Sequence, residues 1–378
     1  MRRPVVVLSG GGTGGHLYPA LAIADELRGM RPDARVVFVG ASKGIEATVL
    51  PERGEDHLLL AVRGLDRSRP LSGWRVLVGL VRGLVRVARL FGSLRPDVVV
   101  VTGGYASAAA GITAGLMGVP LVLQEQNSVP GAVTKLLTRF ATRIHVAYPE
   151  AIDRLPTAHA RCIVSGNPVR ARSTKTRVEA RQAFGVPDDV LLMFVTGGSQ
   201  GSLALNRCVT AFVQAAHHGE VDRPALLHIL WATGRAHYHG VEAALAAVGA
   251  PEWVHALSYV EDMPGALAAA DIALSRAGAM TTAELLNEGL PAILVPLPTA
   301  AENHQMQNAL ALASAGAARV LPESDLSPER LALEITSVTA STEALHEMRA
   351  RASERARPDA TRTIVADVAS LLPARRAA

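Results

Sequence analysis

Three short apolar runs in this chain each lead toward the same tripeptide, Thr-Gly-Gly. The runs are Val5–Ser9, Val98–Val101 and Leu191–Val195, and the tripeptides are Thr13–Gly15, Thr102–Gly104 and Thr196–Gly198. Such runs are typical of buried parallel strands, and glycine-rich loops at their carboxyl ends commonly cradle phosphates or sugars. Because two loops lie in the first half and one in the second, we expect two α/β lobes that present them to a shared cleft.

The size and composition of the chain permit two lobes. Its 378 residues are enough for two domains, and 49% hydrophobic content with 4% aromatics suits buried strands covered by Ala-rich helices. The net charge of +4 favours phosphates, anionic lipid or nucleic acid without choosing among them. Cys162 and Cys208 match no disulfide framework or metal motif, so we expect a reducing compartment and two small core residues.

Strand-like and helix-like segments alternate along the whole chain. We expect strands near residues 4–9, 35–39, 58–62, 97–101, 120–123, 143–147 and 161–164, then near 190–195, 226–231, 253–256, 271–274, 292–295 and 317–320. This alternation predicts an α/β fold of two Rossmann-like parallel-sheet domains that face a cleft. The predicted domains are 1–166 and 167–345. A helical segment, 346–378, follows and packs either on its own lobe or back on the first.

No segment has the pattern of a membrane span. The apolar run after Met1 stops at Ser9, so we interpret it as a first strand rather than a signal peptide. The longest uncharged stretch, Tyr105–Gln124, is broken by glycines and by Pro120. It predicts a helix followed by a strand, and we predict no transmembrane helix.

The first glycine loop admits two interpretations. Gly10, Gly12 and Gly15 fit the dinucleotide fingerprint, but the second strand ends in Gly40–Lys43 without the acidic residue that a ribose needs, which disfavours a nicotinamide or flavin site. His16 follows the glycines, at the expected start of a helix over 17–28. It is either a capping or surface histidine or a base that accepts a proton from a substrate hydroxyl.

The second lobe contains a strand–turn–helix segment that suits a diphosphate. Asp271–Leu274 predicts the strand, and a helix is expected to start at Thr281. A helix N-terminus offers N–H donors and partial positive charge to a leaving diphosphate. Glu284 either completes a capping box with Thr281 or accepts hydrogen bonds from ribose hydroxyls.

Amide side chains follow a later strand in this lobe. The loop 299–303 leads into His304, Gln305 and Asn308. Amides both donate and accept hydrogen bonds, so this segment is either a reader of sugar hydroxyls or a solvated helix start.

Together these motifs resemble one family in the family's own order. They are Gly11–His16, Gly103–Tyr105, Glu125–Asn127, Gly166–Arg170, Gly197–Gly201, Arg276 with Gly278–Glu284, and His304–Gln305 with Asn308. The chain resembles the undecaprenyldiphospho-muramoylpentapeptide β-N-acetylglucosaminyltransferases of peptidoglycan synthesis (MurG), which are GT-B enzymes of glycosyltransferase family 28. The resemblance implies transfer of N-acetylglucosamine from UDP-N-acetylglucosamine to the 4-hydroxyl of undecaprenyl-linked MurNAc-pentapeptide (lipid I), which gives lipid II.

The resemblance also implies roles for individual residues. The first domain receives the acceptor near Gly103, Gly104 and Tyr105, and the second domain binds the donor. Thr13, Gly14 and Gly15 face the donor, and Asn127 contacts its sugar. Arg170 and Ser199 lie near the nucleotide and diphosphate, the Val260 backbone reads uracil, and Glu284 holds ribose. Gln305 reads the sugar hydroxyls, and the helix start is formed by Ala279, Met280, Thr281, Thr282 and Ala283.

The implied chemistry inverts the anomeric centre and needs a general base. Many family members have histidine where this chain has Gln124, which cannot act as a base. His16 is therefore the stronger candidate, with Glu125 in reserve. The chain has no Asp-x-Asp triplet, so we expect chemistry without a metal or cofactor.

Arginines gather between Arg63 and Arg95, where the sole acid is Asp66. On a helix expected near 74–91, Arg75, Arg82, Arg86 and Arg89 form one stripe bordered by Trp74, Val78 and Val85. The pattern fits either a core helix with a solvated edge or a surface for anionic lipid. Because the implied acceptor is a membrane lipid, we expect membrane contact.

The expected location is the cytoplasmic face of the bacterial cell membrane, as a peripheral protein. Expected partners are UDP-N-acetylglucosamine, the lipid-linked acceptor, anionic lipid, and proteins of wall synthesis and division. Few aromatics interleave with the basic residues, so we expect no nucleic acid. Two alternatives remain: a GT-B transferase with another lipid or small-molecule acceptor, and a non-catalytic nucleotide-binding scaffold.

Overall fold

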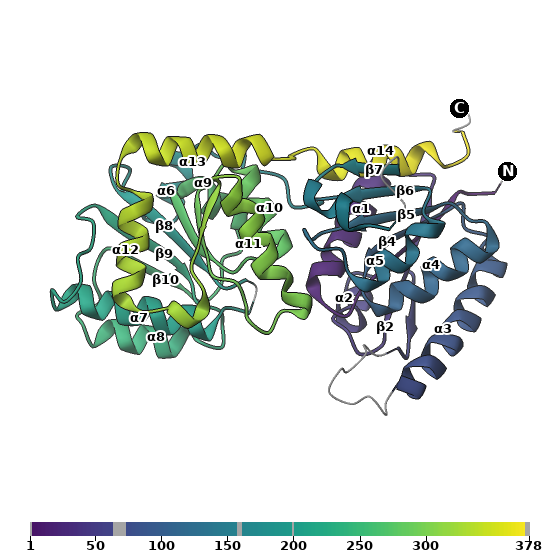
Figure 1. Cartoon of the computed structure of the whole chain (residues 1–378), viewed down its shortest axis with the longest axis horizontal. Helices are drawn as coiled ribbons and strands as arrows, with labels where there is room; N and C mark the ends of the chain where they lie inside the picture. Colours follow the sequence, from purple (N-terminus) through teal and green to yellow (C-terminus); the bar gives the residue numbers. More distant parts are fainter. Residues whose placement is uncertain (1, 63–72, 157–160, 199, 375–378) are drawn as a thin grey trace. The chain divides into compact units, whose positions relative to one another are not determined.

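The computed structural model describes residues 2–62, 73–156, 161–198 and 200–374, except for the side chains of residues 73–77. The chain forms two compact units (Figure 1). The first unit comprises Met1–Val169 and Asp359–Ala378, and the second comprises Arg170–Pro358. The chain therefore leaves the first unit after Val169 and returns to it at Asp359.

The first unit is built on a sheet of seven parallel strands. Their spatial order is β3-β2-β1-β4-β5-β6-β7. The strands are β1 (Val5–Gly10), β2 (Arg35–Ala41), β3 (His57–Leu60), β4 (Val98–Gly103), β5 (Leu121–Glu125), β6 (Arg143–Val146) and β7 (Cys162–Val164). The order reverses between β1 and β4, and in such sheets ligands bind at the carboxyl ends beside the reversal.

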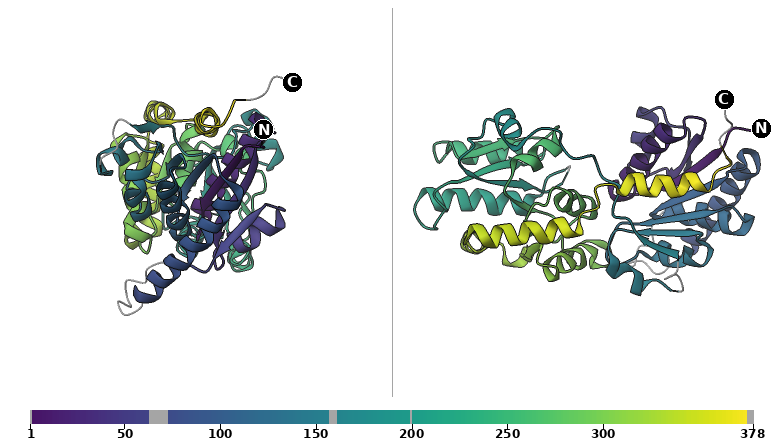
Figure 2. Two further views of the ribbon diagram at one scale, coloured as in Figure 1. Left: turned by 90° about the vertical axis from the view of Figure 1, so that its right-hand side faces the viewer. Right: turned by 90° about the horizontal axis from the view of Figure 1, so that it is seen from above.

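Helices cover both faces of this sheet. They are α1 (Gly14–Met30), α2 (Glu46–Glu52), α3 (Gly73–Leu94), α4 (Tyr105–Met117), α5 (Ala132–Leu137) and α14 (Ala360–Ser370). Alternate strand residues face opposite sides, so Val7 and Val99 pack toward α3 and α4, whereas Val6 and Val100 pack toward α1 and α14. Ile364 and other apolar residues of α14 complete that second core, and Figure 2 shows α14 running along the unit.

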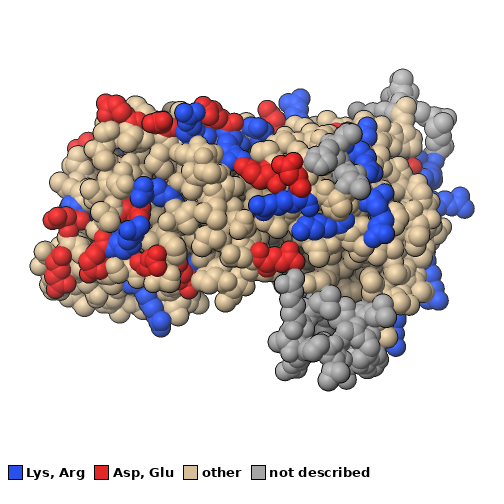
Figure 3. Space-filling view, in the orientation of Figure 1, with Lys and Arg blue, Asp and Glu red and all other residues tan. Residues whose placement is uncertain are grey.

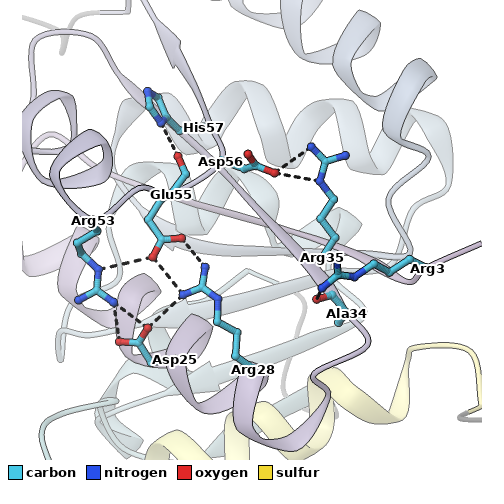
Figure 4. A network of polar contacts seen from close by, with 9 residues as sticks. All are labelled: Arg3, Asp25, Arg28, Ala34, Arg35, Arg53, Glu55, Asp56 and His57. Atoms are coloured by element: carbon cyan, nitrogen blue, oxygen red, sulfur yellow. Dashed lines mark hydrogen bonds and ion pairs between the residues drawn. The ribbon is translucent and has the colours of Figure 1, made fainter.

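A network of charges ties α1 to the segment that follows α2 (Figure 4). Asp25 on α1 accepts hydrogen bonds from Arg28 at 3.2 Å and from Arg53 at 2.8 Å, and Arg28 also pairs with the buried Glu55. The hydrogen bond to Glu55 raises the pKa of Arg28. Because both arginines are substantially exposed, each pair contributes only about 0.2–1 kcal/mol.

The second unit repeats the architecture with six parallel strands in the order β10-β9-β8-β11-β12-β13. The strands are β8 (Leu191–Thr196), β9 (Leu227–Ala232), β10 (Val254–Leu257), β11 (Ile272–Ser275), β12 (Ala292–Leu294) and β13 (Ala318–Val320). The helices are α6 (Arg177–Ala183), α7 (Leu203–His217), α8 (Tyr238–Ala246), α9 (Met263–Ala269), α10 (Ala279–Asn287), α11 (His304–Ser314), α12 (Pro328–Val338) and α13 (Thr342–Arg355). The prediction of two doubly wound parallel-sheet domains is confirmed.

A buried ion pair anchors α6 beneath the second sheet. Arg181 donates to Asp271 at 2.7 Å and to the backbone carbonyl oxygens of Ala269 and Val190, each at 3.0 Å. Asp271 also accepts the backbone N–H of Leu192 at 2.8 Å. The pair therefore fixes the starts of β8 and β11 relative to α6. Among the described helices, none is both long enough and apolar enough to cross a bilayer.

Candidate functional site

The first two glycine loops interlock at the carboxyl ends of β1 and β4. A Cβ on Gly10 would lie 1.9 Å from Thr102 Oγ1, and one on Gly104, whose φ is +84°, would lie 2.0 Å from the carbonyl oxygen of Gly11. The Thr102 hydroxyl donates to the His16 carbonyl oxygen at 2.7 Å. Only glycine permits this approach of backbone to backbone.

The chain's own carboxylate fills the first glycine loop. Glu46, fully buried on α2, accepts the Gly12 N–H at 2.8 Å and 3.0 Å and the Ala41 N–H at 2.7 Å. A Cβ on Gly11 or Gly44 would lie 2.0 Å or 2.3 Å from this carboxylate. Because the Gly12 N–H already donates to Glu46, that group is not available to a phosphate. This part of the loop is therefore held by the chain's own carboxylate.

His16 lies inside the first turn of α1, because the helix begins at Gly14 rather than at the predicted Leu17. Its ring does not cap the helix but faces the second glycine loop. Nδ1 lies 2.9 Å from the Thr102 carbonyl oxygen and 3.0 Å from Gln126 Oε1. Within the described part of the chain, Nε2 has no hydrogen-bond partner, so one ring nitrogen is anchored and the other is open.

Three buried amide side chains continue from His16. Gln126 Nε2 donates to the Thr102 carbonyl oxygen at 2.7 Å and also to Gln124 Oε1. Gln124 Nε2 donates to Asn167 Oδ1 at 3.0 Å, and Asn167 Nδ2 donates to the Gln126 carbonyl oxygen at 3.0 Å. This amide chain, made of Gln126, Gln124 and Asn167, links the end of β5 to the segment after β7.

Both carboxylate oxygens of Glu125 are committed to the loop that follows β5. Oε1 accepts the Asn127 N–H at 3.1 Å, and Oε2 accepts the Gly131 N–H at 3.1 Å. The side chain is buried. Glu125 thus orders the start of α5 and the loop that carries Asn127.

The third glycine loop, after β8, packs against the loop after β9. Gly201 and Gly234 have φ values of +77° and +87°, and a Cβ on Gly201 would lie 2.2 Å from the Thr233 carbonyl oxygen. Ser199 lies outside the described residues. The glycines again serve a close approach between loops at the carboxyl edge of a sheet.

Arg276 braces the same edge from the end of β11. It donates to Ser202 Oγ at 3.1 Å and to the Val295 carbonyl oxygen at 3.2 Å, and it pairs with Glu323. Its side chain is nearly buried. Arg276 therefore ties the loops after β8, β12 and β13 together.

The α10 helix begins at Ala279, two residues before the predicted start. Its N-cap is Gly278, so the capping-box alternative for Thr281 and Glu284 is wrong: both side chains lie too far inside the helix to cap it. Thr282 Oγ1 donates to the Gly278 carbonyl oxygen at 3.1 Å instead. The first N–H groups of a helix lack intrahelical acceptors, so Met280 and Thr281 bring donors to this edge.

The remaining predicted donor residues of the second unit lie around this helix. Burial raises the pKa of Glu284 against the opposing charge of Arg170, so those two side chains interact electrostatically. Gln305 accepts the Leu297 N–H at 3.0 Å through Oε1, so its NH2 group is turned away from that N–H. Val260 is buried. Ala283 follows Thr282 on α10.

Known proteins match this chain over nearly its whole length. A protein of Salinibacter ruber named UDP-N-acetylglucosamine--N-acetylmuramyl-(pentapeptide) pyrophosphoryl-undecaprenol N-acetylglucosamine transferase is 40% identical over 98% of this chain and 97% of its own. A Desulfitobacterium hafniense protein of the same name is 38% identical over 95% of this chain and 97% of its own. The Glycosyltransferase family 28 N-terminal domain matches residues 6–146, and the C-terminal domain matches 192–364. The chain belongs to the MurG family, glycosyltransferase family 28.

Solved structures agree with this MurG-family assignment. The crystal structure of Acinetobacter baumannii MurG has a TM-score of 0.78 and 27% identity, with 97% of this chain and 99% of that one covered. The glycosyltransferase of kitacinnamycin, at 17% identity and a TM-score of 0.70, shares the fold alone. The predicted GT-B fold is thus confirmed.

The predicted membrane stripe of this MurG-family chain lies on α3. One edge of the helix is buried through Val87 and Phe91, whereas Arg82, Arg86 and Arg89 are exposed on the other. Val81 and Val85 beside them are 51% and 46% exposed. The side chains of Trp74 and Arg75 lie outside the described residues. Figure 3 shows basic side chains gathered over the first unit, while acidic and basic side chains mix over the second.

Of the acceptor-side residues predicted for a MurG-family enzyme, Gly103 lies against His16. A Cβ on Gly103 would lie 2.7 Å from His16 Nδ1, and Tyr105 at the start of α4 is 47% exposed. The roles of Glu46 and Gln126 were missed. The one sequence signal for Glu46 was the pair of glycines, Gly40 and Gly44, that flank the space its carboxylate fills.

Proposed function

We propose that this chain transfers N-acetylglucosamine from UDP-N-acetylglucosamine to the 4-hydroxyl of undecaprenyl-diphosphate-linked MurNAc-pentapeptide, converting lipid I to lipid II. The observation that carries the proposal is the near full-length match to transferases named for this reaction. The product is β-linked and the donor α-linked, so one displacement inverts the anomeric centre. The acceptor oxygen attacks C1, the bond to UDP breaks, and the acceptor proton passes to a base.

His16 is the proposed base. Its Nε2 is open while Nδ1 is held by Thr102 and Gln126, so the ring has a fixed direction and one nitrogen ready to accept a proton. Glu125 is the weaker candidate because both of its oxygens already accept backbone N–H groups. In this proposal Gly103, Gly104 and Tyr105 surround the acceptor sugar.

The donor is proposed to bind chiefly in the second unit. The start of α10, from Ala279 to Ala283, stabilises the charge that develops on the leaving diphosphate. Arg170 is proposed to lie near the nucleotide and diphosphate, Glu284 to accept hydrogen bonds from ribose hydroxyls, and the Val260 backbone to read uracil. Gln305 is proposed to donate to the transferred sugar, and Thr13, Gly14, Gly15 and Asn127 are the donor contacts proposed in the first unit.

The α3 stripe is proposed to dock on anionic lipid at the cytoplasmic face of the membrane. Arg82, Arg86 and Arg89 project there beside the exposed Val81 and Val85. Trp74 and Arg75 extend the stripe in sequence. Proteins of wall synthesis and division that work at the same surface are the expected partners.

Transfer kinetics test the reaction and the base together. Radiolabelled UDP-N-acetylglucosamine is supplied with a lipid-linked muramoyl-pentapeptide analogue, and binding of the donor is measured by calorimetry. His16→Gln should lower kcat by roughly 100-fold or more while the donor Kd stays unchanged. His57→Gln, at a surface histidine that contacts backbone, is the matched control. Near-normal turnover of His16→Gln, or a larger loss for Glu125→Gln, contradicts the assignment.

Vesicle flotation tests the docking surface. Each near-surface arginine contributes about 1 kcal/mol, so reversing Arg82, Arg86 and Arg89 to Glu should weaken binding to phosphatidylglycerol vesicles by roughly 100-fold. Reversal of the exposed Arg207, Arg351 and Arg357 in the second unit makes the same change in net charge and is the control. Equal flotation of the two variants, or equal binding of the wild type to neutral vesicles, argues that α3 is a core helix with a solvated edge.

A further inference from the structure

The amide chain beyond His16 has a single direction. The His16 Nδ1 faces Gln126 Oε1, the Gln126 NH2 faces Gln124 Oε1, and the Gln124 NH2 faces Asn167 Oδ1. All three amides are at most 3% exposed. In these side-chain links each NH2 group faces the next side-chain oxygen away from His16, which lets the three linked hydrogen bonds polarise one another in the same sense.

The surroundings of Gln126 fix which way its amide points. Nε2 lies 2.7 Å from the Thr102 carbonyl oxygen and 3.0 Å from the Gln124 carbonyl oxygen, and it also contacts Gln124 Oε1. All three are acceptors. A flipped amide would set an oxygen against three oxygens, so the NH2 group must face them and Oε1 must face His16.

His16 Nδ1 consequently meets two acceptors, Gln126 Oε1 and the Thr102 carbonyl oxygen. A ring nitrogen with a lone pair would be repelled by both, so Nδ1 must carry a hydrogen. We infer that Gln126 is a positioning residue that, with the Thr102 carbonyl, holds neutral His16 as the Nδ1–H tautomer and keeps the Nε2 lone pair for the acceptor proton. The inference rests on the proposed role of His16 as the base.

The hydrogen bond between His16 and Gln126 is also expected to raise kcat. When Nε2 takes the proton from the acceptor hydroxyl, the ring becomes an imidazolium and its Nδ1–H bond to Gln126 becomes charge-assisted. That bond is stronger in the transition state than in the ground state, so it acts on kcat rather than on donor binding. Gln124 and Asn167 act one step further away, by ordering Gln126.

The tautomer is measured directly in the wild-type enzyme. Nitrogen NMR of protein labelled at its histidine rings distinguishes Nδ1–H from Nε2–H, and the signal lost in His16→Gln identifies His16. We expect Nδ1 to be protonated and Nε2 to be bare. An Nε2–H tautomer overturns the inference. Because the NMR measurement needs no turnover, it tests the tautomer independently of whether the chain catalyses the proposed reaction.

Kinetics of two variants test the positioning role. Gln126→Met keeps the length of the side chain but removes its acceptor, and it should lower kcat by about tenfold with the donor KM unchanged. In the His16→Gln background, Gln126→Met should have little further effect, because the two residues act as a unit. A kcat of Gln126→Met equal to that of the wild type, or additive losses in the double variant, overturns the inference.

Discussion

Removal of the Glu46 carboxylate is expected to loosen the first glycine loop by a calculable amount. In Glu46→Ala, the Gly12 and Ala41 N–H groups both lose a charged acceptor. A hydrogen bond to a charged group contributes about 1.5–3 kcal/mol, so two bonds give a loss of at least about 3 kcal/mol. Glu46→Gln keeps one oxygen near both donors and should lose only about 1 kcal/mol.

Hydrogen exchange measures this loss where it occurs. A change of about 3 kcal/mol corresponds to a roughly 100-fold fall in protection at the Ala41 amide. Glu52→Ala is the matched control, because Glu52 is an exposed acid on the same helix. The transfer rate should fall in parallel, since Thr13 and Gly14 follow directly after the loosened Gly12.

The vacated space should itself bind a small carboxylate. In Glu46→Ala, formate at about ten times its dissociation constant should restore about 1.4 kcal/mol of protection, whereas chloride at equal ionic strength should not. Wild-type protein should not respond to formate. If Glu46→Ala loses less than about 1 kcal/mol, or if formate and chloride act alike, then the reasoning that the carboxylate holds this loop is refuted.

Three further predictions concern stability and reactivity. Burial lowers the pKa of His145 below its ordinary value of 6.5 despite Asp367 at 3.0 Å, so unfolding takes up a proton below about pH 6.5. As the pH falls below that value, the free energy of unfolding should decrease by up to about 1.4 kcal/mol per pH unit, and less steeply in His145→Asn. Equal slopes for the two proteins in urea titrations would contradict this. Burial raises the pKa of Cys208 to about 11, so iodoacetamide should label it only when urea unfolds the chain, and rapid labelling of the native protein would refute this. Asp271→Ala leaves the Arg181 charge buried and unpaired, so the free energy of unfolding measured in urea should fall by about 3–5 kcal/mol. The double variant Arg181→Met with Asp271→Leu should recover most of that loss. A loss below about 1 kcal/mol in Asp271→Ala would show that the pair does not stabilise the fold.

The sequence was sufficient for the strands because their signal is local. Runs such as Val98–Val101 are apolar without interruption, and glycine marks where each one ends, so the parallel sheets and the sites at their carboxyl ends were predictable. The placement of the last helix was not, because the short periodic pattern of α14 fits either core. Its Ile364 and Val368 join the first unit.

Helix starts were predicted two or three residues too late at both sites. The prediction treated the glycine-containing segments before both helices as loop or turn, but Gly14 begins α1 and Gly278 is the N-cap of α10. The polar residues behind the site were missed for a different reason. Gln126 meets His16 across 110 residues, and Glu46 meets Gly12 across 34, so no sequence window contains either contact.

The central claim is that His16 takes the proton of the acceptor hydroxyl. A crystal structure of the ternary complex with UDP and a muramoyl-pentapeptide analogue measures this most directly. The account predicts His16 Nε2 within about 2.6–3.2 Å of the 4-hydroxyl oxygen, with Nδ1 still bonded to Gln126. A carboxylate of Glu125, or any other basic group, in that position with His16 Nε2 turned away would contradict it.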